Sequence, residues 1–397
     1  MKKLLCLGGN YFQMTAVKAA KRLGYYVIDA DYSPQNPAHK YADEYYNIST
    51  LDKEGILKLA SDQKVDGVLS YASDVSAPIA AYVAEKLGLP TNPYESVVLM
   101  TRKDMFHPFL KKNGFYVPES IQVHSIKDIY NFFDQVGGDI ILKPVSSSGS
   151  KGVSRITDPA QIEKAFEEAQ KYARGDILVA EKYIQRKNYQ IAGDAFLVDG
   201  KIKFFGLANE HFNDKCSPLV PVGESFPVSL EEQKIAEAKK KIERVLSLLK
   251  MRNGAINLDF MFDAEDKLLI IELGPRNGGN LITDAIKEST GVDLAEYTVK
   301  AAVGEDLSGL EECAWRKNIS SYIWHSEVDG NYREIQFSNE LKRKLIVSDM
   351  FIKQGSNIKK FINGGFGLGA ALIQYDSKDE MLYMMDHMND YYKILLE

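Results

Sequence analysis

The most informative segment of the chain is Ile140-Ile141-Leu142-Lys143-Pro144-Val145-Ser146-Ser147-Ser148-Gly149-Ser150-Lys151-Gly152-Val153. It begins as an apolar strand that ends in a lysine, and a loop of small residues then leads into a second strand. Serine hydroxyls and unhindered amide groups can close around phosphate oxygens, because glycine and serine let the backbone approach. Lys143 adds a positive charge at the end of the strand. The stretch predicts a phosphate-binding loop, and a flexible hairpin with an incidental lysine is the alternative.

Another strand is predicted about thirty residues later, at residues 177–184 (ILVAEKYI). Its apolar part runs into Glu181 and then into an alternation of polar and apolar residues. Such a segment can place backbone N–H and C=O groups against the edge of an adenine ring. On its own pattern it is equally an ordinary buried strand.

Two carboxylates stand in the apolar strands of a predicted hairpin at residues 255–272. Asp259 is the only charged residue within 258–262, and Glu272 ends the apolar run 268–271. Charges inside apolar strands are costly unless they are paired or bound to a metal. Two carboxylates on neighbouring antiparallel strands can converge on one face, and hard oxygen ligands beside a phosphate suit Mg²⁺. A pair of salt-bridged strand acids is the alternative.

The segment after this hairpin, residues 273–280 (LGPRNGGN), opens a predicted helix at 281–287. Glycines before a helix N-terminus can form an anion site. Arg276 carries a rigid fork of donors that matches a carboxylate or a phosphate. A helix cap with a surface arginine is the alternative.

The N-terminal part alternates strands and helices. An apolar run at 4–7 is followed by two glycines, a helix at 14–23 and a strand at 25–28, and the pattern recurs up to about residue 98. This order predicts a doubly wound α/β domain. The run Gly8-Gly9-Asn10-Tyr11-Phe12-Gln13 lacks the third glycine of a dinucleotide-binding turn. We therefore interpret it as a tight turn, and a dinucleotide-binding turn with Asp29 or Asp31 at the ribose is the alternative.

The composition is that of a globular protein of two or three domains: 397 residues, 45% apolar and 26% charged. A net charge of −6 without a basic block argues against nucleic acid and anionic membranes as partners. Three widely separated cysteines indicate reduced thiols. No apolar run approaches the roughly 18 residues of a membrane span, and the first one is too short for a signal peptide. We expect a cytoplasmic protein.

The order of these segments resembles the ATP-grasp superfamily, with Lys103 in a basic helical stretch before them. The resemblance extends over nearly the whole chain and includes residues 66–69 and 86–91. Within the superfamily the chain is similar to carboxylate–amine ligases: L-amino-acid ligases, glycinamide ribonucleotide synthetase, carbamoyl phosphate synthase large-subunit halves and biotin carboxylase. The resemblance implies a doubly wound α/β domain (1–98) followed by an α+β ATP-grasp module (99–300), made of a small lid lobe (about 116–183) and a larger lobe. Residues 301–397 would complete the larger lobe or form a small α+β domain.

The resemblance also implies the site residues. ATP would be bound by Lys103, Lys143, Ser147, Ser148, Gly149, Glu181, Lys182, Tyr183, Ile184 and Asn188. Mg²⁺ would be held by Asp259 and Glu272, and substrate by Arg276, Asn277, Gly278, Gly279, His211 and Glu224. Arg276 would also stabilise charge during transfer.

The implied reaction begins when a carboxylate attacks the γ-phosphate of ATP and forms an acylphosphate, and an amine then displaces phosphate. Many relatives place Asn where this chain has Gly274, so the second Mg²⁺ would have fewer ligands. Relatives often place Glu or His near Asn188 and Gln190, whose amides would bind ribose less strongly.

Two other functions remain open at this point. The first is a carbamoyl- or carboxyphosphate-forming enzyme that uses bicarbonate as its acid. The second is a non-catalytic ATP-binding regulatory protein, against which the set Asp259, Glu272 and Arg276 argues. The expected partners are a small-molecule carboxylate and an amine, whose identities the sequence does not reveal, and a homodimer is left open.

Overall fold

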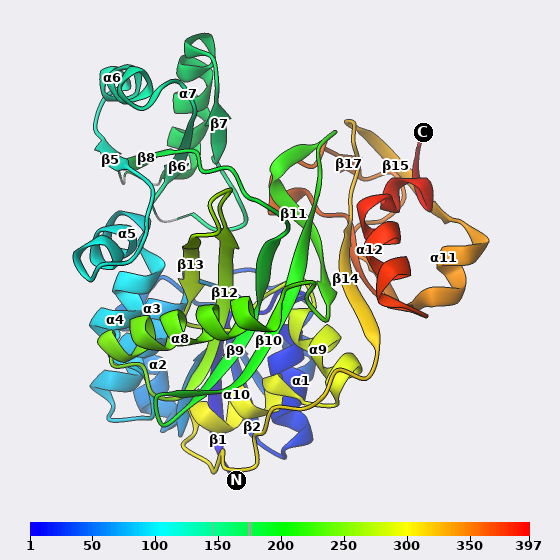
Figure 1. Ribbon diagram of the computed structural model, residues 1–397. Coiled ribbons are helices and arrows are strands. Elements are labelled where there is room, and N and C mark those ends of the chain that lie inside the picture. The colour runs from blue at the N-terminus through cyan, green and yellow to red at the C-terminus, as the bar shows by residue number, and fades with distance from the viewer. Residues whose placement is uncertain (146, 174, 176) are drawn as a thin grey trace.

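The computed structural model describes residues 1–145, 147–173, 175 and 177–397. Within these residues the strands form four sheets, of four, eight, three and four strands. Figure 1 shows the N-terminal domain at the bottom, a small lobe standing apart at the upper left, and the C-terminal residues at the right of the large sheet.

The N-terminal domain is built on a parallel sheet with the strand order β3-β2-β1-β4. Its strands are β1 (Lys3–Leu7), β2 (Tyr26–Ala30), β3 (Glu44–Tyr46) and β4 (Gly67–Ser70). Its helices are α1 (Met14–Arg22), η1 (His39–Tyr41), α2 (Lys53–Gln63) and α3 (Ala77–Lys86). Leu4 and Cys6 pack against α1 and the later helix α10 (Leu294–Ala302), while Leu5 and Leu7 pack against α2 and α3. Helices on both faces of a parallel sheet confirm the predicted doubly wound α/β domain.

The small lobe is an antiparallel sheet, β5-β8-β6-β7, covered by two helices. Its elements are β5 (Ser120–Val123), α6 (Ile126–Val136), β6 (Ile140–Pro144), β7 (Ser154–Ile156), η2 (Pro159–Gln161), α7 (Ile162–Ala173) and β8 (Leu178–Lys182). Helices α4 (Tyr94–Thr101) and α5 (Lys103–Lys112) connect it to the N-terminal domain. Its own apolar core, which includes Ile129, Phe132, Leu142 and Ile162, makes it a separate packing unit.

The large antiparallel sheet has the strand order β13-β12-β9-β10-β11-β14-β18-β16. These strands are β9 (Gln190–Val198), β10 (Lys201–Asn213), β11 (Ser217–Phe226), β12 (Gly254–Phe262), β13 (Leu268–Gly274), β14 (Asn318–Trp324), β16 (Leu345–Met350) and β18 (Gly369–Tyr375). Because side chains alternate along β9, Ala195 and Leu197 face α8 (Glu232–Leu248), whereas Phe196 faces α9 (Ile282–Thr290). Both faces of the sheet are therefore covered.

The C-terminal residues contribute three strands, β14, β16 and β18, to this large sheet. A second sheet, β17-β15-β19, lies beside them, as Figure 1 shows. The remaining elements are β15 (Gly330–Phe337), α11 (Asn339–Lys344), β17 (Asn357–Ile358), η3 (Gly364–Phe366), α12 (Lys378–Asp386), η4 (Met388–Asp390) and β19 (Tyr392–Leu396). In the part of the chain described, none of the helices combines the length and apolar character needed to cross a bilayer.

Gly193 is a position in the large sheet that excludes any side chain. Its φ is +138°, and a Cβ atom there would lie 2.0 Å from the carbonyl oxygen of Gly206 on the neighbouring strand. Both the backbone conformation and the close approach of two strands therefore require glycine.

We predict that Gly193→Ala lowers the free energy of unfolding by at least about 2 kcal/mol, the sum of backbone strain and overpacking. Gly24→Ala is the matched control, because Gly24 also has a positive φ (+77°) but has open space around a Cβ atom. Denaturant unfolding of both variants measures the difference. Equal losses in the two variants would contradict the role of the close strand approach.

Candidate active site

One large cavity, of about 1180 Å³, is bordered by the small lobe, the large sheet and the loops of the N-terminal domain. Most of the site residues predicted from the sequence line it: Lys103, Lys143, Ser147, Ser148, Gly149, Glu181, Lys182, Tyr183, Ile184, Glu224, Asp259, Glu272, Arg276 and Gly279. Four predicted residues are not among its lining: Asn188, His211, Asn277 and Gly278. Ser146, the first serine of the loop, lies outside the described residues.

A buried charge network joins the small lobe to the rest of the site. The Nζ atom of Lys143 on β6 lies 2.6 Å from Oε2 of Glu181 on β8, and both side chains are buried. The Nδ1 atom of His107 on α5 lies 2.8 Å from Oε1 of Glu181. Burial alone would raise the pKa of Glu181, but the charges of Lys143 and His107 outweigh it and hold that pKa well below its ordinary value.

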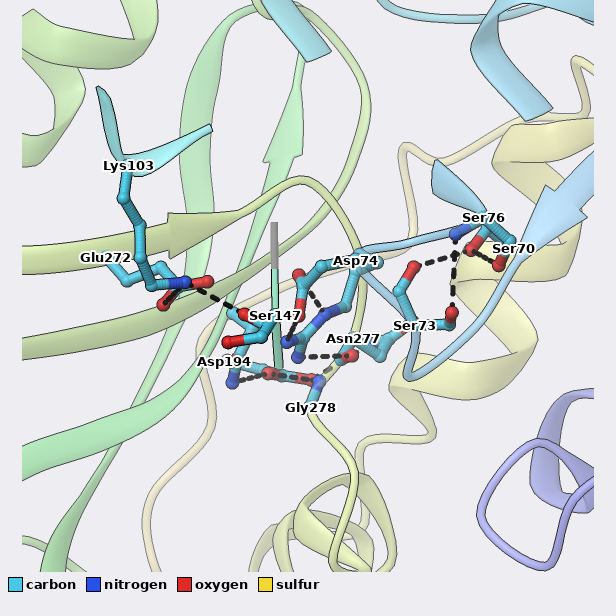
Figure 2. Close-up of polar contacts among 12 residues, drawn as sticks. Ser70, Ser73, Asp74, Ser76, Lys103, Ser147, Asp194, Glu272, Asn277 and Gly278 are labelled. Carbon is cyan, nitrogen blue, oxygen red and sulfur yellow. Dashed lines mark hydrogen bonds and ion pairs between the residues drawn. The ribbon is translucent and has the colours of Figure 1, made fainter. Parts of the chain in front are cut away.

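Lys103 connects the serine–glycine loop with the hairpin that carries the paired acids. Its Nζ atom donates to the carbonyl oxygen of Ser147 (3.1 Å) and lies 3.4 Å from Oε2 of Glu272, as Figure 2 shows. Burial alone would lower the pKa of Lys103, but the negative charge of Glu272 outweighs it and raises that pKa. The ammonium group therefore stays charged beside the loop.

Asp259 and Glu272 are direct cross-strand neighbours on β12 and β13. Burial first, and the charge of Glu272 second, raise the pKa of Asp259 to about 7. A cation between the two carboxylates would relieve this repulsion. In the described part of the chain, no group of three or more His, Cys, Asp or Glu residues is arranged to hold a metal. Two carboxylates nevertheless fit Mg²⁺, which usually takes one or two carboxylates together with substrate phosphates.

The guanidinium of Arg276 is held by a carboxylate of the N-terminal domain. Its Nε donates to Oδ1 of Asp74 at 2.8 Å and its Nη2 to Oδ2 at 2.5 Å, and both side chains are almost buried. Gly274 leaves room for this pair, because a Cβ atom there would lie 3.0 Å from Oδ1 of Asp74 and 3.2 Å from Nε of Arg276. A larger residue at position 274 would push on the ion pair.

The glycine segment after Arg276 is held by hydrogen bonds to Asp194, a fully buried residue of β9. The amide of Gly278 and the side chain of Asn277 both donate to the Asp194 carboxylate (Figure 2). Burial raises the pKa of Asp194 to about 6, although these donors oppose the shift. The polar groups of Asn277 and Gly278 are thus used within the protein, whereas Gly279 faces the cavity.

The two predicted substrate residues of β10 and β11 have different surroundings. Glu224 is buried, lines the cavity, and accepts a hydrogen bond from Ser321. His211 is buried beside Asp386, with 2.7 Å between Nδ1 and Oδ1, and its other ring nitrogen contacts Ser225. Asn188, expected at the ribose, is exposed.

Residues 108–289 match the family model of the ATP-grasp domain. The chain contains an ATP-grasp domain. This confirms the resemblance that was identified from the lysine, loop and carboxylate segments.

Known proteins are similar to the chain well beyond this domain. The carbamoyl phosphate synthase large chain of Pseudothermotoga lettingae is 24% identical over 310 residues, which are 76% of this chain but only 27% of that protein. The formate-dependent phosphoribosylglycinamide formyltransferase of Bacteroides fragilis is 24% identical over 79% of this chain and 80% of its own length. The crystal structure of an L-amino acid ligase from Bacillus licheniformis aligns over 100% of this chain and 99% of its own, with a TM-score of 0.82 and 20% identity.

Sequence reasoning missed several residues that line this cavity, among them Asp74, His107 and Glu210. Gln190, which the sequence offered beside Asn188 as a contact for ribose, does line it. Asp194, which supports it, carries the same signal as Asp259, a lone acid in an apolar strand, and could have been found in that way. Asp74 stands in a polar loop and carries no such signal.

The serine–glycine loop is also contacted by the C-terminal residues and by β11. The amide of Gly364 donates to the carbonyl oxygen of Gly149 at 2.9 Å, and the hydroxyl of Ser150 donates to the carbonyl oxygen of Leu219 at 2.9 Å. Residues beyond 300 therefore help to shape the loop.

We predict that Lys143→Met lowers the free energy of unfolding by about 3 kcal/mol, because it leaves Glu181 without its lysine partner in a buried site. It should also weaken ATP binding, measured by calorimetry. The double variant Lys143→Met with Glu181→Gln should recover most of the stability but not the ATP affinity. Recovery of both properties would show that Lys143 has only a structural role.

Proposed function

We propose that the protein is an ATP- and Mg²⁺-dependent ligase that activates a carboxylate as an acylphosphate, joins it to an amine, and releases ADP and phosphate. One observation carries this proposal: a single cavity brings Lys103, Lys143 and the serine–glycine loop together with the paired carboxylates of Asp259 and Glu272. Cations and small residues suit a polyphosphate, and the acid pair suits the metal that accompanies it.

The residues have distinct roles in this proposal. Lys103 and Lys143 bind phosphate oxygens, and Ser147, Ser148 and Gly149 cover them. Residues 181–184 line the cavity and hold the adenine, and Asp259 and Glu272 would hold Mg²⁺. When bound, Mg²⁺ neutralises charge on the phosphates. Catalysis then depends on positioning and electrostatics rather than on a side-chain nucleophile.

Arg276 is the residue that we assign to the carboxylate and to the charge that develops in transfer. Its fork is already ordered by Asp74, so little side-chain entropy is lost when a substrate carboxylate approaches. The known relatives are named for different substrates. Our proposal therefore takes only the ligase chemistry from them.

The proposal is tested by incubating the protein with ATP, Mg²⁺ and mixtures of carboxylic acids and amines. We expect ADP and phosphate, dependent on the acid and increased by the amine. Formation of AMP and pyrophosphate would contradict the acylphosphate route. ADP formation driven by bicarbonate alone would favour the carboxyphosphate alternative, and ATP binding without turnover would favour a regulatory protein.

We predict that Glu272→Gln reduces ADP formation by about a hundredfold or more, because a metal ligand and a partner of Lys103 are lost. Glu265→Gln is the matched control, since Glu265 is an exposed acid in the turn of the same hairpin. Unfolding curves would establish that both variants are folded. Undiminished ADP release by a folded Glu272→Gln protein would refute the metal assignment.

We predict that Arg276→Ala removes the dependence of ADP formation on the acid while ATP binding stays nearly intact. This change leaves the carboxylate of Asp74 without its partner. The double variant Arg276→Ala with Asp74→Asn removes both charges, so the same measurements are made on it as well. Both should show the same loss of acid dependence. Lost ATP affinity with an unchanged acid preference would place the carboxylate site elsewhere.

A further inference from the structure

One part of the cavity wall is formed by three aromatic rings that the ligase chemistry does not use. Tyr11 and Phe12 follow β1, and Phe351 follows β16, and all three line the cavity. The ring centres of Tyr11 and Phe351 are 4.6 Å apart, and those of Phe12 and Phe351 are 5.7 Å apart. The hydroxyl of Tyr11 donates to the carboxylate of Asp349, which fixes the cluster across the two segments.

A buried carboxylate lies on another part of the same wall. Glu224 is only 2% exposed and lines the cavity, and its partners are the neutral groups of Ser321 (2.5 Å) and Asn280 (3.5 Å). Within the part of the chain that the structure describes, no lysine or arginine forms an ion pair with it. Its cross-strand neighbour Glu210 adds a second carboxylate to this wall. A buried carboxylate without a cationic partner is costly, so this wall favours a cationic ligand.

The segment 279–280 connects the carboxylate to the aromatic cluster. The side chain of Asn280 contacts Glu224, and a Cβ atom at Gly279 would lie 4.0 Å from the ring of Phe12. Arg276, which we assign to the substrate carboxylate, precedes this segment by three positions and lines the same cavity. The arginine, the carboxylate and the aromatic cluster therefore all border one cavity and are connected along residues 276–280.

The N-terminal wall of the cavity offers no positive charge to a phosphorylated substrate. Its described lining residues are Asn10, Tyr11, Phe12, Gln35, Asn36, Pro37, Ala72 and Asp74. The lysines and arginines that line the cavity belong to α5, to the small lobe and to the segment between β8 and β9, apart from Arg276, which is paired with Asp74. A sugar phosphate bound at this wall would find neither lysine nor arginine for its anionic group.

We propose that the acid substrate is an unphosphorylated amino acid with an apolar, best aromatic, side chain. Its ammonium group lies at Glu224 and its side chain packs on Tyr11, Phe12 and Phe351, while its carboxylate faces Arg276. This inference rests on the proposed ligase function, and it names the class of acid that the ligase activates.

The experiment measures binding by calorimetry in the presence of a non-hydrolysable ATP analogue and Mg²⁺. The probes are L-phenylalanine, L-alanine, phenylpropanoate, which lacks only the amino group of phenylalanine, and ribose phosphate. We expect phenylalanine to bind about tenfold more tightly than phenylpropanoate, since a charged hydrogen bond is lost, and about tenfold more tightly than alanine, since apolar burial is lost. Ribose phosphate should not bind.

Two variants separate the two contacts. Glu224→Gln should abolish the preference for phenylalanine over phenylpropanoate, and Phe12→Ala should abolish the preference over alanine. Glu334→Gln, at an exposed acid of β15, is the control and should change neither ratio. Calorimetry with the ATP analogue alone would show whether each variant still binds nucleotide.

The inference is overturned if ribose phosphate binds and phenylalanine does not, or if Glu224→Gln leaves the amino-group preference unchanged. A raised Mg²⁺ requirement with an unchanged preference in Glu224→Gln would also overturn it, by assigning this carboxylate to a metal. Failure of the ligase proposal is distinguishable, because it would appear as selective phenylalanine binding without ADP formation.

Discussion

The ion pair between Lys143 and Glu181 is the interaction on which the rest of the site depends. Both groups are buried, and such a pair is tolerated only when each charge keeps its partners. Here His107 of α5 faces the second oxygen of Glu181 and donates through Nε2 to the carbonyl oxygen of Ile271 on β13. The small lobe, the connecting helix and the strand that carries Glu272 are thereby held together at one point.

The same network keeps positive charge at the small-lobe end of the cavity and negative charge along the large sheet. Lys143 and Lys103 are each held near a carboxylate, so neither ammonium lies unpaired in a poorly solvated place. Among the residues that the structure describes, Gln190 is the hydrogen-bond donor to Asp259, and burial beside Glu272 raises the pKa of this carboxyl. The protein thus presents paired cations and under-compensated carboxylates to a ligand, which is the charge arrangement that ATP with Mg²⁺ requires.

Gly274 leaves space for an ion pair between two domains. The residue has no side chain, and a Cβ atom there would press on Asp74 and Arg276. The loop that carries Asp74 is fixed by hydrogen bonds among Ser70, Ser73 and Ser76, which Figure 2 shows. The N-terminal domain therefore orders the arginine instead of remaining a separate module.

The features that depend on neighbours along the chain could be predicted from the sequence. The sequence predicted the glycine–serine loop between two strands. It also predicted that Asp259 and Glu272 lie together, because a short hairpin fixes its own register. The alternation of the N-terminal strands and helices likewise revealed the doubly wound domain, since its period is local.

The tertiary structure alone decided the contacts between distant segments. Asp74 and Arg276 are 202 positions apart, and Tyr11 and Asp349 are 338 apart, so no local pattern relates them. The position of His211 in the sequence suggested a contact with substrate. Its ring is instead hydrogen-bonded to Asp386 of α12, 175 positions later. Which side chain faces the cavity depends on how separately folded units dock, and docking follows from the shapes of complete surfaces rather than from the period of any one segment.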